Sequence, residues 1–369
     1  MTAAAERRSV MSIPLFPMTQ QHRKPIPSAR LLLILWTCTF LGACSIGAPS
    51  NGAGSEPVVR LAYFPNITHS QALIGLARGD FQQALGPAVR IEATAFNAGP
   101  SVIEALFAEQ IDLAYIGPNP AINGYVQSDG RALRVLAGAT SGGAAFVVRA
   151  EADIRTPADL HGKRLATPQL GNTQDVALRA YLVANGLETV EHGGDVEVVP
   201  TANPQILDLF LLGQIDGAWV PEPWASRLIV EANGELFLDE RDLWPAGDFV
   251  TANIIVRTGF LQDHPDLVRS FLAAHVAVTQ WMMEHSDEAQ AIVNAEIERL
   301  TGRGLGDEVI AMAWSRLRPT WDPLSDSLRA SAHAAFEAGF LSEEPDLTHI
   351  YDLALLNDVL DAGGLPRVE

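Results

Sequence analysis

The segment Gln110-Ile111-Asp112-Leu113-Ala114-Tyr115 recurs as Gln214-Ile215-Asp216-Gly217-Ala218-Trp219. The same offset takes Arg60-Leu61-Ala62 to Arg164-Leu165-Ala166. One fixed offset that holds without gaps across several elements indicates an internal duplication. Each copy combines short apolar strands with helical stretches, so the sequence predicts two lobes of similar βαβ architecture.

The chain is expected to cross between these lobes twice. An apolar run at 144–149 is mirrored by a second run at 249–256, and two crossings would form a hinge beside a cleft. We predict an α/β fold with lobe 1 at 58–142 and 250–369 and lobe 2 at 143–249.

The C-terminal part of the chain has a helical pattern and is expected to cover lobe 1. Its predicted helices occupy 265–284, 287–300, 307–317 and 324–338, with a last piece around 347–360. Trp281, Trp314 and Trp321 in this region are predicted to be packing residues rather than ligand contacts.

The N-terminal segment has the pattern of an export signal. Basic residues precede ten mostly apolar residues at 31–40, far fewer than the ~20 that span a bilayer. The run ends in Leu41-Gly42-Ala43-Cys44, which resembles the lipobox of bacterial lipoproteins. We expect 1–43 to be a signal peptide, Cys44 to carry lipid, and 44–57 to be a flexible tether. The alternative is an ordinary signal peptide with an incidental cysteine.

Composition excludes several classes of protein. The 369 residues include 25 Lys and Arg against 44 Asp and Glu, a net charge of −19, which argues against a nucleic-acid partner. The two cysteines, Cys38 and Cys44, are too few for a disulfide scaffold.

The motifs of common enzyme classes are missing from the sequence. No serine elbow and no phosphate loop ending in Gly-Lys-Ser/Thr is present, and the nine histidines lack metal-ligand spacing. We therefore expect no catalysis, no metal and no cofactor.

Small polar residues gather where predicted strands lead into helices. In open α/β sheets ligands bind at the carboxyl ends of strands, and helix N-termini there favour anions. Four such junctions lie at 65–70, 97–101, 171–175 and 201–204, at equivalent places in the two copies. Any one of these junctions alone indicates only a helix cap. The four together favour a cleft between the lobes that accepts an anion.

Two further loops at 117–120 and 221–224 follow strands of the two copies. Trp219 and Trp224 could form the wall of a ligand pocket or belong to the core, and both readings stay open. Glu222 could pair with a ligand ammonium or with a nearby arginine.

Several segments together resemble the solute-binding proteins of ABC importers, of the nitrate, aliphatic sulfonate and taurine type. They are 63–69, 96–100, 115–120, 166–173 and 218–224. The resemblance implies a two-lobed periplasmic-binding-protein fold of type II that closes on a small ligand. It also implies delivery to a permease and its ATPase, without catalysis.

The resemblance and the loop positions together select seventeen ligand-binding residues. They are Asn66, Thr68, His69, Gly99, Pro100, Ser101, Pro118, Asn119, Thr140, Ser141, Gly171, Asn172, Thr173, Asn203, Trp219, Glu222 and Trp224. The resemblance implies a small organic anion as the ligand, similar to an aliphatic sulfonate, taurine or nitrate. No arginine lies in these loops, so such an anion would be held by N–H and hydroxyl donors. We expect a lipid-anchored monomer in the periplasm or on the outer face of the cell membrane.

Two other functions compete with this interpretation. Enzymes and binders for pyrimidine precursors share the scaffold, and a sensory or adhesion lipoprotein would need no transporter. The sequence has neither a lysine suitably placed to hold pyridoxal phosphate nor a cysteine-rich segment for iron, and both absences count against the enzyme.

Overall fold

The computed structural model describes residues 57–369. The predicted signal peptide, Cys44 and the tether up to residue 56 lie outside the described residues. Among residues 57–369, no helix has both the length and the apolar character needed to cross a membrane.

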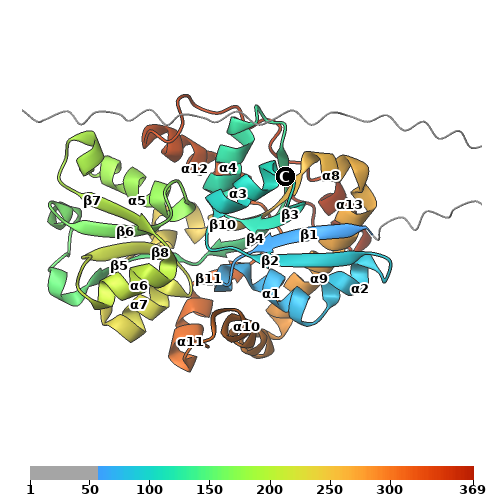
Figure 1. Cartoon of the computed structure of the whole chain (residues 1–369), viewed down its shortest axis with the longest axis horizontal. Helices are drawn as coiled ribbons and strands as arrows, with labels where there is room; N and C mark the ends of the chain where they lie inside the picture. Colours follow the sequence, from blue (N-terminus) through green and yellow to red (C-terminus); the bar gives the residue numbers. More distant parts are fainter. Residues whose placement is uncertain (1–56) are drawn as a thin grey trace, which may run out of the picture. The chain divides into compact units, whose positions relative to one another are not determined.

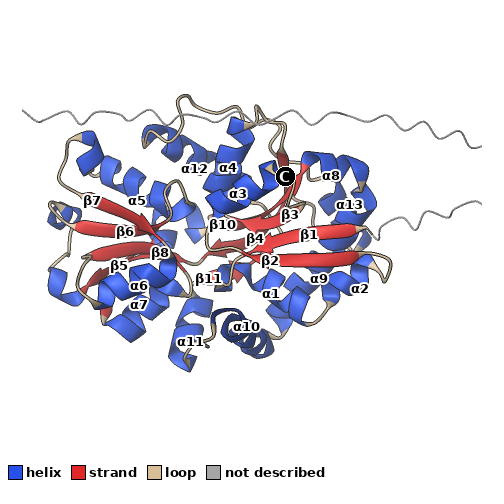
Figure 2. Cartoon of the chain, viewed as in Figure 1, coloured by secondary structure: helices blue, strands red, loops and turns tan. Residues whose placement is uncertain are grey.

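Six strands form the first sheet, in the order β11-β4-β10-β3-β1-β2 (Figure 2). β1, β2 and β3 run parallel, whereas β10 lies antiparallel between β3 and β4, and β11 pairs antiparallel with β4. The bounds are β1 Val58–Tyr63, β2 Arg90–Ala95, β3 Leu113–Ile116, β4 Leu133–Gly142, β10 Val250–Arg257 and β11 Leu317–Pro319.

Five strands form the second sheet, in the order β7-β6-β8-β5-β9. β6, β7 and β8 are parallel, and β5 lies antiparallel between β8 and β9. The bounds are β5 Ala144–Arg149, β6 Arg164–Pro168, β7 Glu197–Thr201, β8 Gly217–Pro221 and β9 Gly234–Asp239. The chain passes between the sheets after β4 and after β9, and the first passage turns sharply at Gly142 and Gly143, whose φ angles are +76° and +82°.

Helices cover both faces of the first sheet (Figure 1). One face packs against α1, α2, α9, α10, α11 and α13, and the other packs against α3, α4 and α12. Their bounds are α1 Ser70–Ala77, α2 Asp80–Leu85, α3 Gly99–Phe107, α4 Pro118–Gln127, α8 Thr258–Asp263, α9 Pro265–Glu284, α10 Ser286–Thr301, α11 Asp307–Ser315, α12 Ser325–Glu337 and α13 Ala354–Ala362.

The second sheet has the same layered construction. α6 (Asn203–Leu211) and α7 (Trp224–Ala232) pack on one face, and α5 (Thr173–Ala184) packs on the other. Helices on both faces of a mostly parallel core leave the strand ends as the accessible edge of each sheet.

The duplication seen in the sequence has the same geometry in both lobes. Asp112 accepts a hydrogen bond from the Arg60 backbone N–H at 3.0 Å, and Asp216 accepts one from the Arg164 backbone N–H at 2.8 Å. Both aspartates are therefore structural. Each one ties the strand that follows it to the first strand of its copy.

The C-terminal helices lie close to their predicted ranges, but they reach beyond the first lobe. α9, α10 and α13 pack on the first lobe as expected, whereas α11 also contacts α7 and α12 also contacts α5. Hydrophobicity alone could not reveal these contacts, because an apolar helix face does not specify which lobe covers it. Trp281, Trp314 and Trp321 are half-buried against the core of the first lobe.

Candidate ligand-binding site

A small polar cavity lies between the two lobes, at the carboxyl ends of their strands. Its volume is about 20 Å³, little more than the ~10–15 Å³ that one water requires. Its lining residues are Phe64, Asn66, Thr68, His69, Asn97, Gly117, Asn172, Thr173, Gln174, Asn203, Pro221 and Thr251. None of them is Asp, Glu, Lys or Arg, so only uncharged groups and His69 face this space.

Six of the seventeen predicted ligand residues line this cavity. They are Asn66, Thr68, His69, Asn172, Thr173 and Asn203. Four further lining residues fall within segments that carried the family resemblance but were not selected: Phe64, Asn97, Gly117 and Pro221. Gln174 and Thr251 were also missed. Thr251 had no signal in the sequence, because it reaches the cavity only through the return of β10 into the first sheet.

His69 is a neutral hydrogen-bond donor in this cavity. Its ring is 2% exposed, and Nδ1 accepts a hydrogen bond from the Phe64 backbone N–H at 3.2 Å. Burial lowers the pKa of His69 to about 3. The neutral ring therefore carries its proton on Nε2, because Nδ1 serves as an acceptor.

The second lobe contributes two buried polar groups without a partner. Thr173 and Asn203 are 6% and 5% exposed, and neither the Thr173 hydroxyl oxygen nor the Asn203 amide oxygen has a hydrogen-bond partner within the described part of the chain. A buried polar atom without a partner costs about 1–3 kcal/mol. A ligand that hydrogen-bonds to these two side chains would recover this energy. The Asn203 amide can present its NH₂ group to an anion after a half-turn.

Of the helices α3, α4, α5 and α6, α5 offers the most backbone N–H groups to an anion at its N-terminus. α3, α4 and α6 each have proline in their first turn, and proline has no N–H to donate. α5 begins with Thr173-Gln174-Asp175, each with an N–H group, after the N-cap residue Asn172. The Asp175 N–H donates to the Asn172 backbone oxygen at 3.1 Å, which leaves the N–H groups of Thr173 and Gln174, two residues that line the cavity, as the donors for an anion.

The negative charge of Asp175, in this first turn, is compensated within the protein and so repels a bound anion little. Its carboxylate accepts hydrogen bonds from the Gly171 backbone N–H at 2.8 Å and the Thr167 hydroxyl at 2.7 Å. It also forms an ion pair with Arg179 at 3.3 Å, in which both side chains are buried. The pair is therefore neutral as a whole, and it fixes the loop that leads into α5.

The affinity for a permanently charged anion is expected to stay within about twofold between pH 5 and pH 8. A histidine with an ordinary pKa of about 6.5 would become cationic in this range and strengthen anion binding as the pH falls. His69, with its pKa at about 3, stays neutral throughout. Calorimetric titration with ethanesulfonate at several pH values measures this. A marked gain in affinity at pH 5 that persists in Glu240→Gln, which removes the nearby buried carboxyl group whose pKa is raised to about 7, would contradict a neutral His69.

Eleven of the predicted ligand residues lie outside the polar cavity. They are Gly99, Pro100, Ser101, Pro118, Asn119, Thr140, Ser141, Gly171, Trp219, Glu222 and Trp224. Most of them are committed to contacts within the protein. Their small or polar character reflects helix starts and close packing, which sequence patterns do not distinguish from ligand contacts.

Neither of the two tryptophans lines this polar cavity. Trp219 is fully buried, stacks on Phe146 with ring centroids 5.5 Å apart, and donates its indole N–H to Glu240 at 2.8 Å. Trp224 donates its indole N–H across the lobes to the Asn66 side-chain oxygen at 3.1 Å.

Glu222 is likewise a structural residue. It is fully buried, pairs with Arg316 at 2.9 Å, and accepts hydrogen bonds from the backbone N–H and the hydroxyl of Ser226. Of its two proposed partners, the arginine is the one present.

The remaining predicted residues serve the framework around the cavity. Thr140 donates to the Thr68 backbone oxygen at 2.7 Å, and Ser141 donates to Asp248 at 3.0 Å. Asn119 donates to the Ser331 backbone oxygen at 3.1 Å and so holds α12 in place. The Ser101 hydroxyl accepts a hydrogen bond from Gln169 of the other lobe at 3.3 Å. Together with the bond between Trp224 and Asn66, this contact closes the lobes over the cavity.

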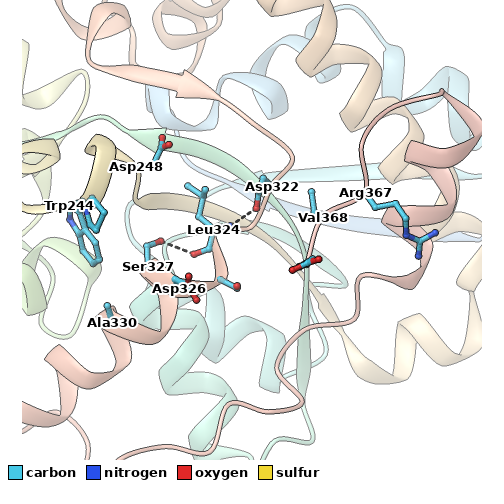
Figure 3. Close-up of a pocket in the computed structure, with 12 residues that line it drawn as sticks. Trp244, Asp248, Asp322, Leu324, Asp326, Ser327, Ala330, Arg367 and Val368 are labelled. Atoms are coloured by element: carbon cyan, nitrogen blue, oxygen red, sulfur yellow. Dashed lines mark hydrogen bonds between the residues drawn. The ribbon is translucent and has the colours of Figure 1, made fainter.

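A much larger cavity of about 630 Å³ shares no lining residue with the polar cavity (Figure 3). It is lined by Trp244, by the start of α12 and by the last residues of the chain, and its acids include Asp248, Asp322 and Asp326. Its one basic residue, Arg367, forms an ion pair with Asp361. This acidic surface would repel an anion, so size does not make it the anion site.

No cluster of three or more His, Cys, Asp or Glu side chains that could hold a metal ion occurs within residues 57–369.

Solved structures of binding proteins share this fold. The alkanesulfonate-binding protein SsuA from Xanthomonas axonopodis pv. citri, bound to MOPS, superposes with a TM-score of 0.68 at 20% identity over 82% of this chain and 100% of that one. The periplasmic nitrate-binding protein NrtA from Synechocystis PCC 6803 superposes with a TM-score of 0.68 at 17% identity, over 85% of this chain and 90% of that one. The predicted periplasmic-binding-protein fold is confirmed.

Sequence comparison finds relatives among binding proteins and among enzymes. The taurine-binding periplasmic protein of Escherichia coli (strain K12) is 27% identical over 63% of this chain and 70% of its own length. The 2'-hydroxybiphenyl-2-sulfinate desulfinase of Rhodococcus erythropolis is 28% identical over 48% of this chain and 60% of its own length. A sequence model of the NMT1-like family matches residues 52–297, more than half of the chain, and the protein therefore belongs to the NMT1-like family.

Proposed function

We propose that this protein is the substrate-binding component of an ABC importer and that it captures a small organic anion outside the cytoplasm. The observation that carries the proposal is the uncharged polar cavity between the lobes, where the Thr173 hydroxyl and the Asn203 amide oxygen have no hydrogen-bond partner among residues 57–369. Binding proteins for taurine, alkanesulfonates and nitrate are among its relatives and structural neighbours.

An anion suits this cavity because its donors are uncharged and directed. The Nε2–H of His69, the Thr173 hydroxyl and the first N–H groups of α5 can each donate to an oxyanion. A sulfonate has three oxygens and keeps its charge at every physiological pH, so it can accept several of these bonds at once. The cavity volume of about 20 Å³ holds little more than one water, so the lobes must part to admit a sulfonate head group.

A thermal-shift screen of the purified protein tests the proposal. The panel contains sulfonates, taurine, nitrate, aromatic acids and pyrimidines. A ligand at a hundred times its Kd adds about 2.7 kcal/mol to the free energy of unfolding, which raises the melting temperature. We expect at least one organic anion to do so, and a panel in which no anion raises the melting temperature would refute the proposal.

Transport also requires a membrane complex and, in this proposal, a lipid anchor. We propose Cys44 as the lipidated residue and a permease with its ATPase as the partner, with the binding protein acting as a monomer. Metabolic labelling with a radioactive fatty acid in cells that produce wild-type protein or Cys44→Ser tests the anchor. Label of equal intensity in both would exclude Cys44.

The enzyme alternative finds no support in the residues around the cavity. Both cysteines precede residue 57, so the described part of the chain contains no thiol nucleophile, and His69 is held neutral. Incubating the protein with an aryl sulfinate and measuring sulfite release would reveal a desulfinase activity, which we expect to be absent.

A further inference from the structure

A second cavity, distinct from the polar one, lies in the seam between the lobes and has a volume of about 240 Å³. We call it the seam cavity. Its wall combines α5 of the second lobe, the hinge segment around residues 240–244, and residues of α4 and α12. Thr173 lines both cavities, so they meet at the start of α5.

The seam cavity is apolar except for a few groups. Alanines and Val176 of α5 form one side, and Trp219, Trp244 and Tyr181 supply aromatic surface. The ionisable carboxyl group in this wall is that of Glu240, which is 3% exposed. Aromatic surface around a carboxylate is the combination that recognises an alkylammonium group, through charge pairing and cation–π contact.

Glu240 has no cationic partner among residues 57–369. Its Oε2 accepts the Trp219 indole N–H at 2.8 Å, and the Trp244 side chain also hydrogen-bonds to the carboxyl group. The charge acting on Glu240 is that of Asp239, which is already paired with Arg241 at 2.7 Å. Burial raises the pKa of Glu240 to about 7. A buried carboxyl group without a counter-ion is costly in its charged form, and a bound cation would offset that cost.

We propose that the seam cavity is a binding site for an apolar molecule or segment that carries an ammonium group, with Glu240 as its counter-ion. The wall spans both lobes, so an occupant would also favour the closed arrangement. The ammonium group has two sources: the far end of a zwitterion whose anionic head lies in the polar cavity, or a separate amine.

Calorimetric titration with benzylamine, and with benzyl alcohol as its uncharged counterpart, tests the site. The wild-type protein is expected to bind benzylamine at least ~10-fold tighter, because one desolvated charge pair is worth more than about 1.4 kcal/mol. Glu240→Gln is expected to abolish this preference. Asp242→Asn is the matched control, because it removes an exposed acid two residues away that lines no part of the seam cavity, and its preference should be unchanged.

The pH dependence gives a second readout. Only the carboxylate pairs with the ammonium group, so benzylamine affinity should fall by about tenfold for each pH unit below 7 and level off above it. Tyr181, whose pKa burial raises, is uncharged in this range, and Asp239, whose pKa is lowered, remains ionised. Glu240→Gln should remove the dependence.

Ala180→Leu fills the seam cavity without changing a charge and should block benzylamine while the protein remains folded, as judged by its melting temperature. A series of aminoalkanesulfonates of increasing chain length distinguishes the two sources of the ammonium group. If the wild-type protein binds one of them more tightly than the alkanesulfonate without the amine, and Glu240→Gln loses this gain, the ligand is a zwitterion. If benzylamine and ethanesulfonate bind at the same time, the ammonium group belongs to a separate amine.

The proposal is overturned if benzylamine binds no better than benzyl alcohol, or if Glu240→Gln retains the preference. Neither result would touch the polar cavity, whose anion binding is measured separately by the thermal-shift screen. The two proposals therefore fail independently.

Discussion

Replacing Gly117 with alanine is expected to weaken ligand binding by roughly 10- to 100-fold and to change the stability of the ligand-free protein little. A Cβ atom at this position would lie 2.3 Å from the Thr173 hydroxyl oxygen on the other lobe and 3.6 Å from the Thr251 backbone oxygen. Overpacking of this kind costs about 1–3 kcal/mol, and 1.4 kcal/mol is a factor of ten in affinity. The ligand-free protein avoids the clash by opening, whereas the closed complex cannot.

Gly306→Ala is the matched control for this experiment. Gly306 caps α11 with φ −68° and ψ 153°, and Gly117 caps α4 with φ −69° and ψ 159°. The backbone therefore tolerates alanine equally at both positions, but nothing lies within 4 Å of a Cβ at Gly306. Calorimetry measures the affinity of both variants for a ligand from the screen. The difference between the two affinities is the effect of the contact between the lobes. Wild-type affinity in Gly117→Ala would show that closure does not bring Gly117 against Thr173.

Replacing Arg316 with methionine is expected to destabilise the protein by about 3–5 kcal/mol, because it leaves Glu222 buried without its counter-ion. The two side chains are 2.9 Å apart, with the carboxylate fully buried and the guanidinium 11% exposed. Both partners are tied to the first passage between the sheets. Gly143 donates its backbone N–H to the Arg316 backbone oxygen at 2.9 Å and accepts the Glu222 backbone N–H at 2.8 Å.

Denaturant unfolding of three variants measures this effect. Arg318→Met is the control, because its ion pair with Asp248 is about half exposed on both sides and should cost less than about 1 kcal/mol. The double variant Glu222→Leu/Arg316→Met should recover most of the loss, because it leaves no unpaired charge. Equal losses in Arg316→Met and Arg318→Met would contradict a special role for the buried pair.

The pH dependence of Arg316→Met follows from the same pair. Burial raises the pKa of Glu222 even in the intact protein, where Arg316 opposes that rise. Without Arg316 the folded state holds the Glu222 proton more tightly than the unfolded state does. The free energy of unfolding must then fall as the pH rises from about 4.5, the pKa of Glu222 in the unfolded state, to its higher pKa in the folded state.

The local sequence was sufficient to predict most secondary structure. The predicted helix at 265–284 corresponds to α9 (Pro265–Glu284). Residues 70–85 have a helical pattern throughout, but Gly79, whose φ is +76°, divides them into α1 and α2. The last helix begins only at Ala354, later than predicted, although the apolar pattern starts near residue 347. Apolar spacing indicates which segments are buried, but a buried loop and a buried helix can share that spacing.

The site was predictable only in part, for a different reason. Asn172 and Thr173 begin a helix at the cleft, and helix-start motifs therefore found them. The same motifs also selected Gly99 and Asn119. Gly99 allows α3 to approach Pro120, where a Cβ would lie 2.3 Å from its ring, and Asn119 holds α12. A motif shows that a residue begins a helix, but not what that residue faces.

The amino-acid sequence by itself determined the duplication, the two lobes and the family, because these depend on residue order and apolar spacing along one chain. The tertiary structure alone decided which polar groups face a shared space and which side chain pairs with which charge. In the folded protein Arg316 pairs with Glu222, and Glu240 has no cationic partner among the described residues. Burial in the fold also lowers the pKa of His69 to about 3. The physical reason is that burial and partner choice depend on contacts between residues far apart in the chain, whereas strands and helices depend on neighbours.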